Sequence, residues 1–597
     1  MAAWRAMLRQ FDLQNDPFRV ISLFKAMQIG KENDPVTDPF VYASLIKACN
    51  KVLGINEGKS IHSRVVKLAL DYNLNVLNSL IHYYASVNGS VKYARVLFDK
   101  MPDRTVVTVN SMVSGFLKNN QFDFGLSLFK KVLTGAFGLS MKPNFVTLMV
   151  LISGCVENGG YSIGRLLHSY CCKTGMDLRI EVCNTLIDFY CKNGYLDIAT
   201  KLFNEMVEKD LVSWNTMIAG FARSNNCSKA LSLFREMRYK DIGYDIVSFV
   251  NLILACANGG DLDSGKMVHV HIIASVEEIP VSLGTVLINM YSRCGSIKFA
   301  RKVFEELPDK NIASWNSIIH GYVECGLNSE ALRLFNLMKC SKVEADDVTM
   351  LGIISACRNS GELSLCIDIH SYIMRNDNLS RSNVLQNALV DMYAKCGNMA
   401  RAKSVFDKML VKDVISWTSI IVGHAINGEG EEALHAFRKM CAEKVEPNSV
   451  TFIAVLLACD HSGLVEEGQN LYDTMCKVYN IEPQIEHCGC MIDMLARAGM
   501  LDEANKFVKK MPVEPNTVIW RMMINACRVH GDFDLGLCLV SSLVGVKKSP
   551  KIEDHVISSI IFAETGRWND VLHERSTVIA QKPSKVPGKS CISELTD

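Results

Sequence analysis

The chain has 597 residues, too many for one ordinary hydrophobic core, so it forms several domains or an array of small units. Hydrophobic residues make up 49% and prolines number only 14, which argues against disorder over most of the chain. The formal net charge is +1, so a globally basic nucleic-acid binder is excluded and any such surface has to be local.

Cysteine usage and the N-terminal residues bear on where the protein works. The 22 cysteines are spread evenly along the chain, and the N-terminus has no secretory signal. Both observations favour a reducing compartment, in which Cys acts as a small apolar residue. No run of eighteen apolar residues occurs, so no membrane span is predicted. The first eleven residues, MAAWRAMLRQF, carry two Arg and no acid. They fit either the start of an organelle-targeting peptide or simply the first helix.

An internal repeat of 101 to 106 residues runs through the chain. Its members are Trp214, Trp315 and Trp417; Cys49, Cys155, Cys256, Cys357 and Cys459; His62, His168, His269 and His370; and Phe98, Phe203, Phe304 and Phe406. Because four residue types share one spacing, chance coincidence is negligible. Regular recurrence at helical spacing predicts that the Trp, His and Cys residues are packing residues, not catalytic ones.

Each period divides into three related units of one plan. Examples are LVSWNTMIAGFARSNNCSKALSLFREM from Leu211, IVSFVNLILACANGGDLDSGKMVHVHII from Ile246 and VSLGTVLINMYSRCGSIKFARKVFEELP from Val281. An apolar stretch at helical spacing ends in a turn containing Gly or Asn, and a second amphipathic stretch follows. Each unit therefore predicts two short helices joined by a tight turn.

Three kinds of residue mark the ends and the contacts of these helices. They are Gly194, Gly295 and Gly397 where the first helix stops, Ala199, Ala300 and Ala402 inside the second, and Pro102, Pro308 and Pro512 after it. A helix pair of this size cannot bury its apolar face alone, so neighbours must stack on it. The sequence predicts an all-α solenoid with an extended concave face. Tetratricopeptide repeats share that architecture, so repeat length alone does not decide function.

The segments SWNTMIAGF, LINMYSRCG, VDMYAKCGNMARAKSVFDKM and GKMVHVHI resemble the plant pentatricopeptide repeat (PPR) family, specifically its PLS subclass. The resemblance covers essentially the whole chain. It implies a right-handed α-solenoid superhelix of tandem helix-turn-helix repeats, and it implies binding of single-stranded RNA in plastids or mitochondria.

The resemblance divides the chain into about fifteen units of three types. P-type units are expected at 1–38, 106–144, 211–245, 312–346 and 414–448, with a short insertion near Gly135 to Ser140. L-type units are expected at 39–73, 145–179, 246–280, 347–382 and 449–484, and S-type units at 74–105, 180–210, 281–311, 383–413 and 485–516. The tandem array thus spans 39–484, after a first unit at 1–38 that is truncated or overlaps a targeting segment, and 485–516 is its last S-type unit.

The C-terminal segments resemble the E subgroup of that subclass. TVIWRMMINACRVHGDFDLG, in 517–550, resembles the first E-type motif, and AETGRWNDV, in 551–597, resembles a degenerate second one. KVPGKSCIS resembles the segment that follows, although Cys591 stands where the family usually has Trp. We expect these last motifs to present a docking surface.

Deaminase chemistry is not expected of this chain. Family members with a DYW domain carry a zinc site that needs His-x-Glu and Cys-x-x-Cys, and neither pattern occurs here. His487, Cys488 and Cys490 are the nearest approach, but they lie within an expected repeat helix and are interpreted as packing residues. No P-loop or nucleophile elbow occurs either, so the sequence predicts no enzyme activity, no metal and no cofactor.

By family resemblance, two residues of each P- or S-type unit recognise one base: the fifth and the last. The pairs are Asn78 with Thr105, Asn110 with Asn144, Asn184 with Asp210, Asn215 with Asp245, Thr285 with Asn311, Asn316 with Asp346, Asn387 with Asp413 and Thr418 with Asn448. Asn with Asp implies U, Thr with Asn implies A, and Asn with Asn or Thr implies a pyrimidine. The implied RNA, 5′ to 3′ with N for any base, is Y-Y-N-U-U-N-A-U-N-U-A-N-N.

Other units depart from this scheme. L-type units have apolar fifth residues (Met149, Val250, Leu351 and Ile453) and are expected to recognise bases weakly. Gly489 with Asn516, and Arg5 with Asp38, are nonstandard pairs. A structural interpretation also exists, because Asn and Asp cap helices and favour turns. Capping alone does not explain why eight P- and S-type units have only Asn or Thr at one position.

The alternation of unit types favours a site-recognition factor for C-to-U editing of organellar transcripts. Its expected partners are single-stranded organellar RNA, a DYW-type deaminase in trans, and proteins of the multiple organellar RNA editing factor family on the L-type units. The last S-type unit would then lie a few nucleotides upstream of the edited C. Alternatives are an RNA splicing, stability or translation factor and a protein-binding scaffold. The mitochondrion is the favoured compartment, with the chloroplast as the alternative.

Overall fold

A computed structural model describes residues 38–52, 55–87, 90–138, 141–545 and 552–580, together with Arg19 and Ser22. Over these residues it contains α-helices, one three-residue 3-10 helix and no strand, which confirms the predicted all-α solenoid class. The expected unit at 1–38, apart from its last residue and two others, and the tail after residue 580 lie outside the described residues.

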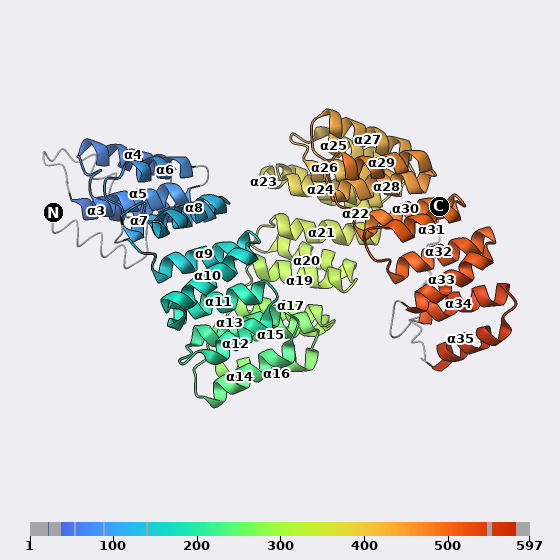
Figure 1. The fold of residues 1–597 in the computed structure, drawn as a ribbon, viewed down its shortest axis with the longest axis horizontal. Helices are drawn as coiled ribbons and strands as arrows, with labels where there is room; N and C mark the ends of the chain where they lie inside the picture. The colour runs from blue at the N-terminus through green and yellow to red at the C-terminus, as the bar shows by residue number, and fades with distance from the viewer. Residues whose placement is uncertain are drawn as a thin grey trace. The chain divides into compact units, whose positions relative to one another are not determined.

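The chain divides into two compact units, Met1–Pro308 and Asp309–Asp597, and within each the helices stack as successive hairpins (Figure 1). The described helices of the first unit are α3 Pro39–Val52, α4 Ile55–Lys67, α5 Leu74–Ser86, α6 Val91–Lys100, α7 Val106–Lys118, α8 Phe122–Leu133, α9 Phe145–Glu157, α10 Tyr161–Thr174, η1 Met176–Leu178, α11 Ile180–Lys192, α12 Leu196–Glu205, α13 Leu211–Arg223, α14 Cys227–Tyr239, α15 Ile246–Gly259, α16 Leu262–Ser275, α17 Val281–Arg293 and α18 Ile297–Glu306.

The second unit repeats the same plan. Its described helices are α19 Ile312–Glu324, α20 Asn328–Cys340, α21 Asp347–Ser360, α22 Leu363–Arg375, α23 Asp377–Ser380, α24 Asn383–Lys395, α25 Met399–Lys408, α26 Val414–Ile426, α27 Gly430–Ala442, α28 Ser449–Ser462, α29 Val465–Lys477, α30 Ile485–Arg497, α31 Leu501–Lys510, α32 Thr517–His530, α33 Phe533–Gly545, α34 Ile552–Glu564 and α35 Trp568–Ala580. The short helices η1 and α23 follow the second helix of an L-type unit and were not expected from the sequence. The division into P-, L- and S-type units stays a prediction.

Local sequence explains where the helices stop. Gly194, Gly295 and Gly397 each lie two residues after the last residue of a first helix, at φ values of +82°, +70° and +73°. This left-handed conformation ends a helix and is nearly free of strain only for glycine, so the predicted C-terminal caps are confirmed. Each predicted proline (Pro102, Pro308 and Pro512) follows a second helix, as expected.

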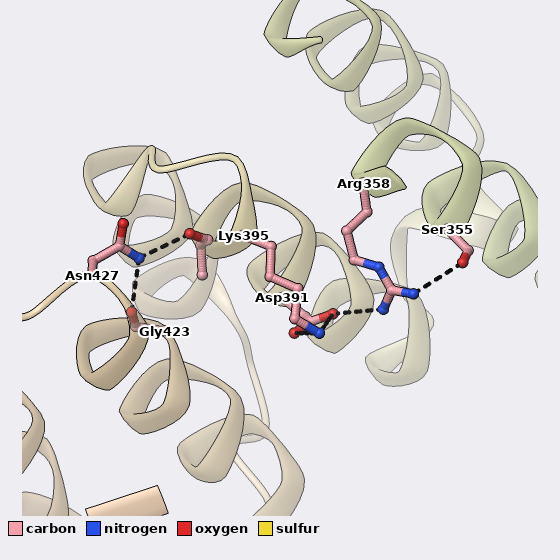
Figure 2. Close-up of polar contacts among 7 residues, drawn as sticks. Ser355, Arg358, Asp391, Lys395, Gly423 and Asn427 are labelled. Atoms are coloured by element: carbon pink, nitrogen blue, oxygen red, sulfur yellow. Dashed lines mark hydrogen bonds and ion pairs between the residues drawn. The ribbon is translucent and has the colours of Figure 1, made fainter. Parts of the chain in front are cut away.

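Consecutive first helices contact one another directly, as α5 contacts α7 and α24 contacts α26. The amide of Asn427, which caps α26, donates to the carbonyl oxygen of Gly423 in that helix at 2.8 Å (Figure 2). It also donates to the carbonyl oxygen of Ala394, in the preceding first helix, at 2.9 Å. A Cβ atom on Gly423 would lie 2.8 Å from the Cβ of Ala394. Asn119 ties α7 to α5 in the same way, through the carbonyl of Ala85 at 2.8 Å. These contacts place the first helices of neighbouring repeats side by side.

The repeating Trp, His and Cys residues are packing residues, as predicted. Trp214 and Trp417 are 0% and 1% exposed, and all five repeating cysteines are 0% exposed. Each repeating histidine pairs through Nδ1 with a tyrosine hydroxyl of the next repeat, as His269 does with Tyr291 at 2.9 Å. Burial lowers the pKa of His269, so its ring is neutral at physiological pH.

Two absences concern the described residues. None of their helices is both long enough and apolar enough to cross a membrane. Likewise, no group of three or more His, Cys, Asp or Glu side chains within the described ranges is arranged to hold a metal ion. His487 and Cys488 are both 0% exposed in α30, which agrees with their interpretation as packing residues.

Candidate nucleic-acid interface

The last residue of each of the eight predicted P- and S-type base-recognition units caps the following helix. In every case its side-chain oxygen accepts a hydrogen bond from the backbone N–H three residues further on; the eight residues are Thr105, Asn144, Asp210, Asp245, Asn311, Asp346, Asp413 and Asn448. Such a cap stabilises a helix by about 1 kcal/mol. Capping therefore accounts for the residue types at this position.

The fifth residues have no capping role, because they lie one turn inside their helices. In five units the Asn amide at this position donates to the side chain that caps the next helix. The Nδ2 to Oδ1 distances are 3.1 Å for Asn110 to Asn144, 3.3 Å for Asn184 to Asp210, 3.1 Å for Asn215 to Asp245, 3.0 Å for Asn316 to Asp346 and 3.5 Å for Asn387 to Asp413. The structure thus brings together residues that are 26 to 34 positions apart in sequence.

The other three predicted pairs contain threonine. Thr418 contacts Thr451, hydroxyl to hydroxyl, at 2.8 Å, and Thr451 in turn bonds to Asn448 at 3.0 Å. Thr285 donates to the carbonyl oxygen of Val281 at 2.7 Å. Its predicted partner, Asn311, belongs to the second compact unit of the chain.

The remaining pair is Asn78 with Thr105. No hydrogen bond joins their side chains within the described ranges, and the amide oxygen of Asn78 is buried without a partner. The threonine hydroxyl instead lies 3.0 Å from that of Thr108 in its own capping box.

The paired groups combine a buried amide with an ionised carboxylate. The four Asn side chains paired with Asp are only 7–9% exposed, whereas Asp210 and Asp245 are exposed. Burial raises the pKa of these two carboxyls, but the hydrogen bonds that they accept outweigh it and hold the pKa below its usual range. The net direction is the same for Asp346 and Asp413. Each pair therefore presents fixed donors and acceptors at one edge of the helix array.

Seven exposed aliphatic side chains that the sequence analysis did not single out lie on first helices, four of them in units with a predicted base-recognition pair. Each is the second residue of a first helix: Val107, Val212, Val247, Val348, Val384, Ile415 and Val450, between 49% and 59% exposed. Residues three apart in a helix share a face, so each lies beside the fifth residue of its own unit. The signal was present in the sequence as a β-branched residue three positions before the fifth residue. We call these seven residues the aliphatic row.

Carboxylates neutralise much of the positive charge on the first helices of the later repeats. Figure 2 shows Asp391 between Lys395, 2.9 Å away in the same helix, and Arg358 of the preceding first helix, 3.2 Å away. Asp188 lies between Lys192 and Arg223 in the same manner, at 2.7 and 3.2 Å. These pairs join neighbouring repeats and leave little free charge.

Two lysines of the first repeats differ from these charged groups. Lys47 and Lys118 form no ion pair with any described residue, and both are exposed. A cavity of about 680 Å³ on α3, α5 and α7 is lined by Lys47, Asn78, His82 and Val107 among others. Burial lowers the pKa of His82, and the charges of Lys118 and Lys47 lower it further. The cavity thus combines positive charge with one predicted base-recognition residue.

Comparisons with known proteins identify the repeats. The PPR repeat family profiles match residues 209–258, 310–359 and 412–461, and related PPR repeat profiles match 107–134, 184–207, 285–312, 387–414 and 486–514. The chain is 34% identical over 592 residues to the pentatricopeptide repeat-containing protein At4g33990 of Arabidopsis thaliana, covering 98% of this chain and 70% of that protein. The chain belongs to the pentatricopeptide repeat family.

Two further relatives from Arabidopsis thaliana are named by organelle. The mitochondrial pentatricopeptide repeat-containing protein At2g03380 is 32% identical over 98% of this chain and 84% of its own length. The chloroplastic protein DOT4 is 34% identical over 99% of this chain and 67% of its own length. Among solved structures, the PPR10 protein in complex with an 18-nucleotide psaJ RNA element has a TM-score of 0.54 at 15% identity, over 96% of this chain and 90% of that one. This likeness supports the same fold.

Proposed function

We propose that this protein binds single-stranded RNA in sequence-specific fashion and acts as a site-recognition factor for C-to-U editing of organellar transcripts. The observation that carries the proposal is the recurring hydrogen bond between the fifth residue of one unit and the last, capping residue, found in five units. A protein-binding scaffold has no need for the same polar pair in successive repeats. The similar PPR10 protein was solved with RNA bound, which supports the same ligand class here.

The geometry favours single-stranded RNA over a duplex. Single-strand binding proteins place exposed apolar or aromatic groups against base faces and polar groups against the Watson–Crick edge. The aliphatic row provides the first kind of group, and the paired amides and carboxylates provide the second. The bases of a duplex are stacked and paired, so this surface could reach neither their faces nor their Watson–Crick edges.

Lys47 and Lys118, which form no ion pair with any described residue, support binding of the RNA backbone. Changing both to Ala should weaken binding about three- to tenfold at physiological salt. It should also reduce the magnitude of the slope of log affinity against log salt by about 1.4, because each contact to a single strand displaces about 0.7 of a counterion. The loss should be equal for matched and scrambled RNA. Lys67→Ala, on α4 and outside the cavity lining, is the control. An unchanged salt slope in the double variant would contradict a phosphate role.

Exposed apolar side chains support protein partners on two regions. On α16, in an L-type unit, Met267, Val270 and Ile273 lie three residues apart and are 56–67% exposed. These side chains suit the proposed editing-factor partner on L-type units. On the last hairpin, Trp568 and Leu572 are 65% and 68% exposed, which suits recruitment of a DYW-type deaminase in trans.

The test is the state of organellar transcripts in a plant line that lacks the protein. Conversion should be lost at one or a few cytidines that lie downstream of a sequence matching the predicted pattern. The mitochondrion is the favoured compartment and the chloroplast the alternative, since relatives of both kinds are known. A line with every site edited but with a retained intron would instead favour a splicing factor.

A further inference from the structure

The P-type and S-type units hold the fifth-residue Asn differently. In three P-type units its amide oxygen accepts a hydrogen bond from the hydroxyl of the third residue of the next helix: Thr147 to Asn110 at 2.6 Å, Ser248 to Asn215 at 2.8 Å and Thr349 to Asn316 at 2.6 Å. These hydroxyl groups are buried, with side chains 0–1% exposed. We refer to Thr147, Ser248 and Thr349 as the orienting hydroxyls.

The S-type units lack this contact. The amide oxygens of Asn78, Asn184 and Asn387 are all buried without a hydrogen-bond partner. A hydroxyl residue stands at the equivalent position here too, but the hydroxyls of Ser213 and Ser416 donate to the capping carboxylate, at 2.7 and 2.8 Å, and not to an Asn amide. The difference therefore lies in geometry and not in residue type.

The hydroxyl contact fixes which way the amide faces. An Asn side chain has two N–H donors and one oxygen acceptor, and a 180° rotation exchanges them. In the unit of Asn215, rotation would place the amide oxygen against the carboxylate of Asp245, so the 3.1 Å hydrogen bond between them would be lost. Ser248 could then accept from the amide N–H group only by turning its own hydroxyl proton from the amide oxygen to that carboxylate, which lies 3.0 Å away. In the unit of Asn387 the same rotation breaks one bond of 3.5 Å.

The orientation matters because uracil and cytosine differ in the same donor and acceptor sense. At N3, uracil has an N–H group that donates, whereas cytosine has a lone pair that accepts. At C4, uracil has a carbonyl oxygen that accepts, whereas cytosine has an amino group that donates. An amide fixed in one orientation can satisfy only one of the two bases. An amide that rotates can satisfy either.

We propose that Thr147, Ser248 and Thr349 are positioning residues for base selection, so that P-type units with an Asn–Asp pair discriminate U from C more strictly than S-type units with the same pair. The inference rests on the proposed recognition of RNA by the fifth residues. It assigns to each orienting hydroxyl a role in the specificity of the preceding unit, although the residue itself contacts no base.

Ser248 and Ser416 offer a matched test. Both are fully buried third residues of a helix, and both form a capping box with an Asp. Only Ser248 also bonds to a fifth-residue Asn.

Ser248→Ala should lower the U-over-C preference at the base aligned with unit 211–245 about fivefold, the loss expected for one hydrogen bond. Ser416→Ala should leave the preference at the base aligned with unit 383–413 unchanged, while both lower the melting temperature to a similar extent.

The measurement is fluorescence anisotropy with RNAs that carry U or C at one of the two positions. Ser248→Thr should retain the preference, because Thr349 and Thr147 occupy the same position in other units. Equal loss of preference in Ser248→Ala and Ser416→Ala, or no loss in either, would overturn the inference. If the unaltered protein shows no U-over-C preference at any position, it is instead the proposed RNA recognition that fails.

Discussion

Replacing Asn316 by Thr and Asp346 by Asn is expected to change the base preferred by unit 312–346 from U to A. The chain already contains the template for this change. In unit 414–448 the hydroxyl of Thr418 contacts that of Thr451 at 2.8 Å, and Asn448 caps the next helix. Thr349 stands at the position equivalent to Thr451, so the double variant reproduces the arrangement.

The expected size of this change is large because a mismatched base costs about 1–3 kcal/mol, or roughly ten- to a hundredfold in affinity. Folding should be little affected, since the asparagine that replaces Asp346 keeps a cap oxygen of the kind that Asn448 uses. The same exchange at Asn387 and Asp413 should change a second position from U to A. Titration of the variants with RNAs that differ only at those two bases is the measurement. An unchanged preference at both positions would defeat the assignment of base-recognition residues.

Trp417→Ala is expected to destabilise the second compact unit, Asp309–Asp597, by about 3–5 kcal/mol. This is the usual cost of removing a large buried aromatic side chain. Trp417 is 1% exposed, and its ring lies 4.8 Å from that of Phe406 in an edge-to-face contact with the second helix of the preceding repeat. Its removal leaves a cavity between two repeats, and in a solenoid each repeat depends on its neighbours.

The control is Trp568→Ala, in the same compact unit but on a later helix, because Trp568 is 65% exposed. It should shift the unfolding transition by less than about 0.5 kcal/mol, as surface changes do. Circular dichroism during denaturant unfolding measures both variants. Equal shifts would contradict the conclusion that the repeating Trp residues are packing residues.

Much of the fold could be predicted from the sequence because the repeat makes each signal occur several times. Gly194, Gly295 and Gly397 share one place in the period, and the repeating Trp and Cys residues each share a place of their own. The position of each helix and turn is therefore indicated several times, so an ambiguous signal in one repeat is resolved by the others. The short helices η1 and α23 were missed because, within the described chain, only two of the expected L-type units contain such a helix, and the two differ in sequence.

The candidate interface could be predicted only in part. The pairing of Asn215 with Asp245 follows from family resemblance, and the structure shows them hydrogen-bonded. The role of Ser248 could not be predicted, because Ser416 has the same residue type and capping position without the contact to Asn. Sequence spacing does not decide which of two acceptors a hydroxyl bonds to; the approach of neighbouring helices does.

The central claim is that paired residues on successive repeats recognise an ordered series of bases. Its most direct test is the affinity of the purified protein for a 13-nucleotide RNA matching Y-Y-N-U-U-N-A-U-N-U-A-N-N, compared with an RNA of the same composition in which both A bases have exchanged places with U bases. The two exchanges create four mismatches, and each mismatch costs about 1–3 kcal/mol, so the matched RNA should bind at least about a thousandfold more tightly. Equal affinity for the two RNAs would contradict the account.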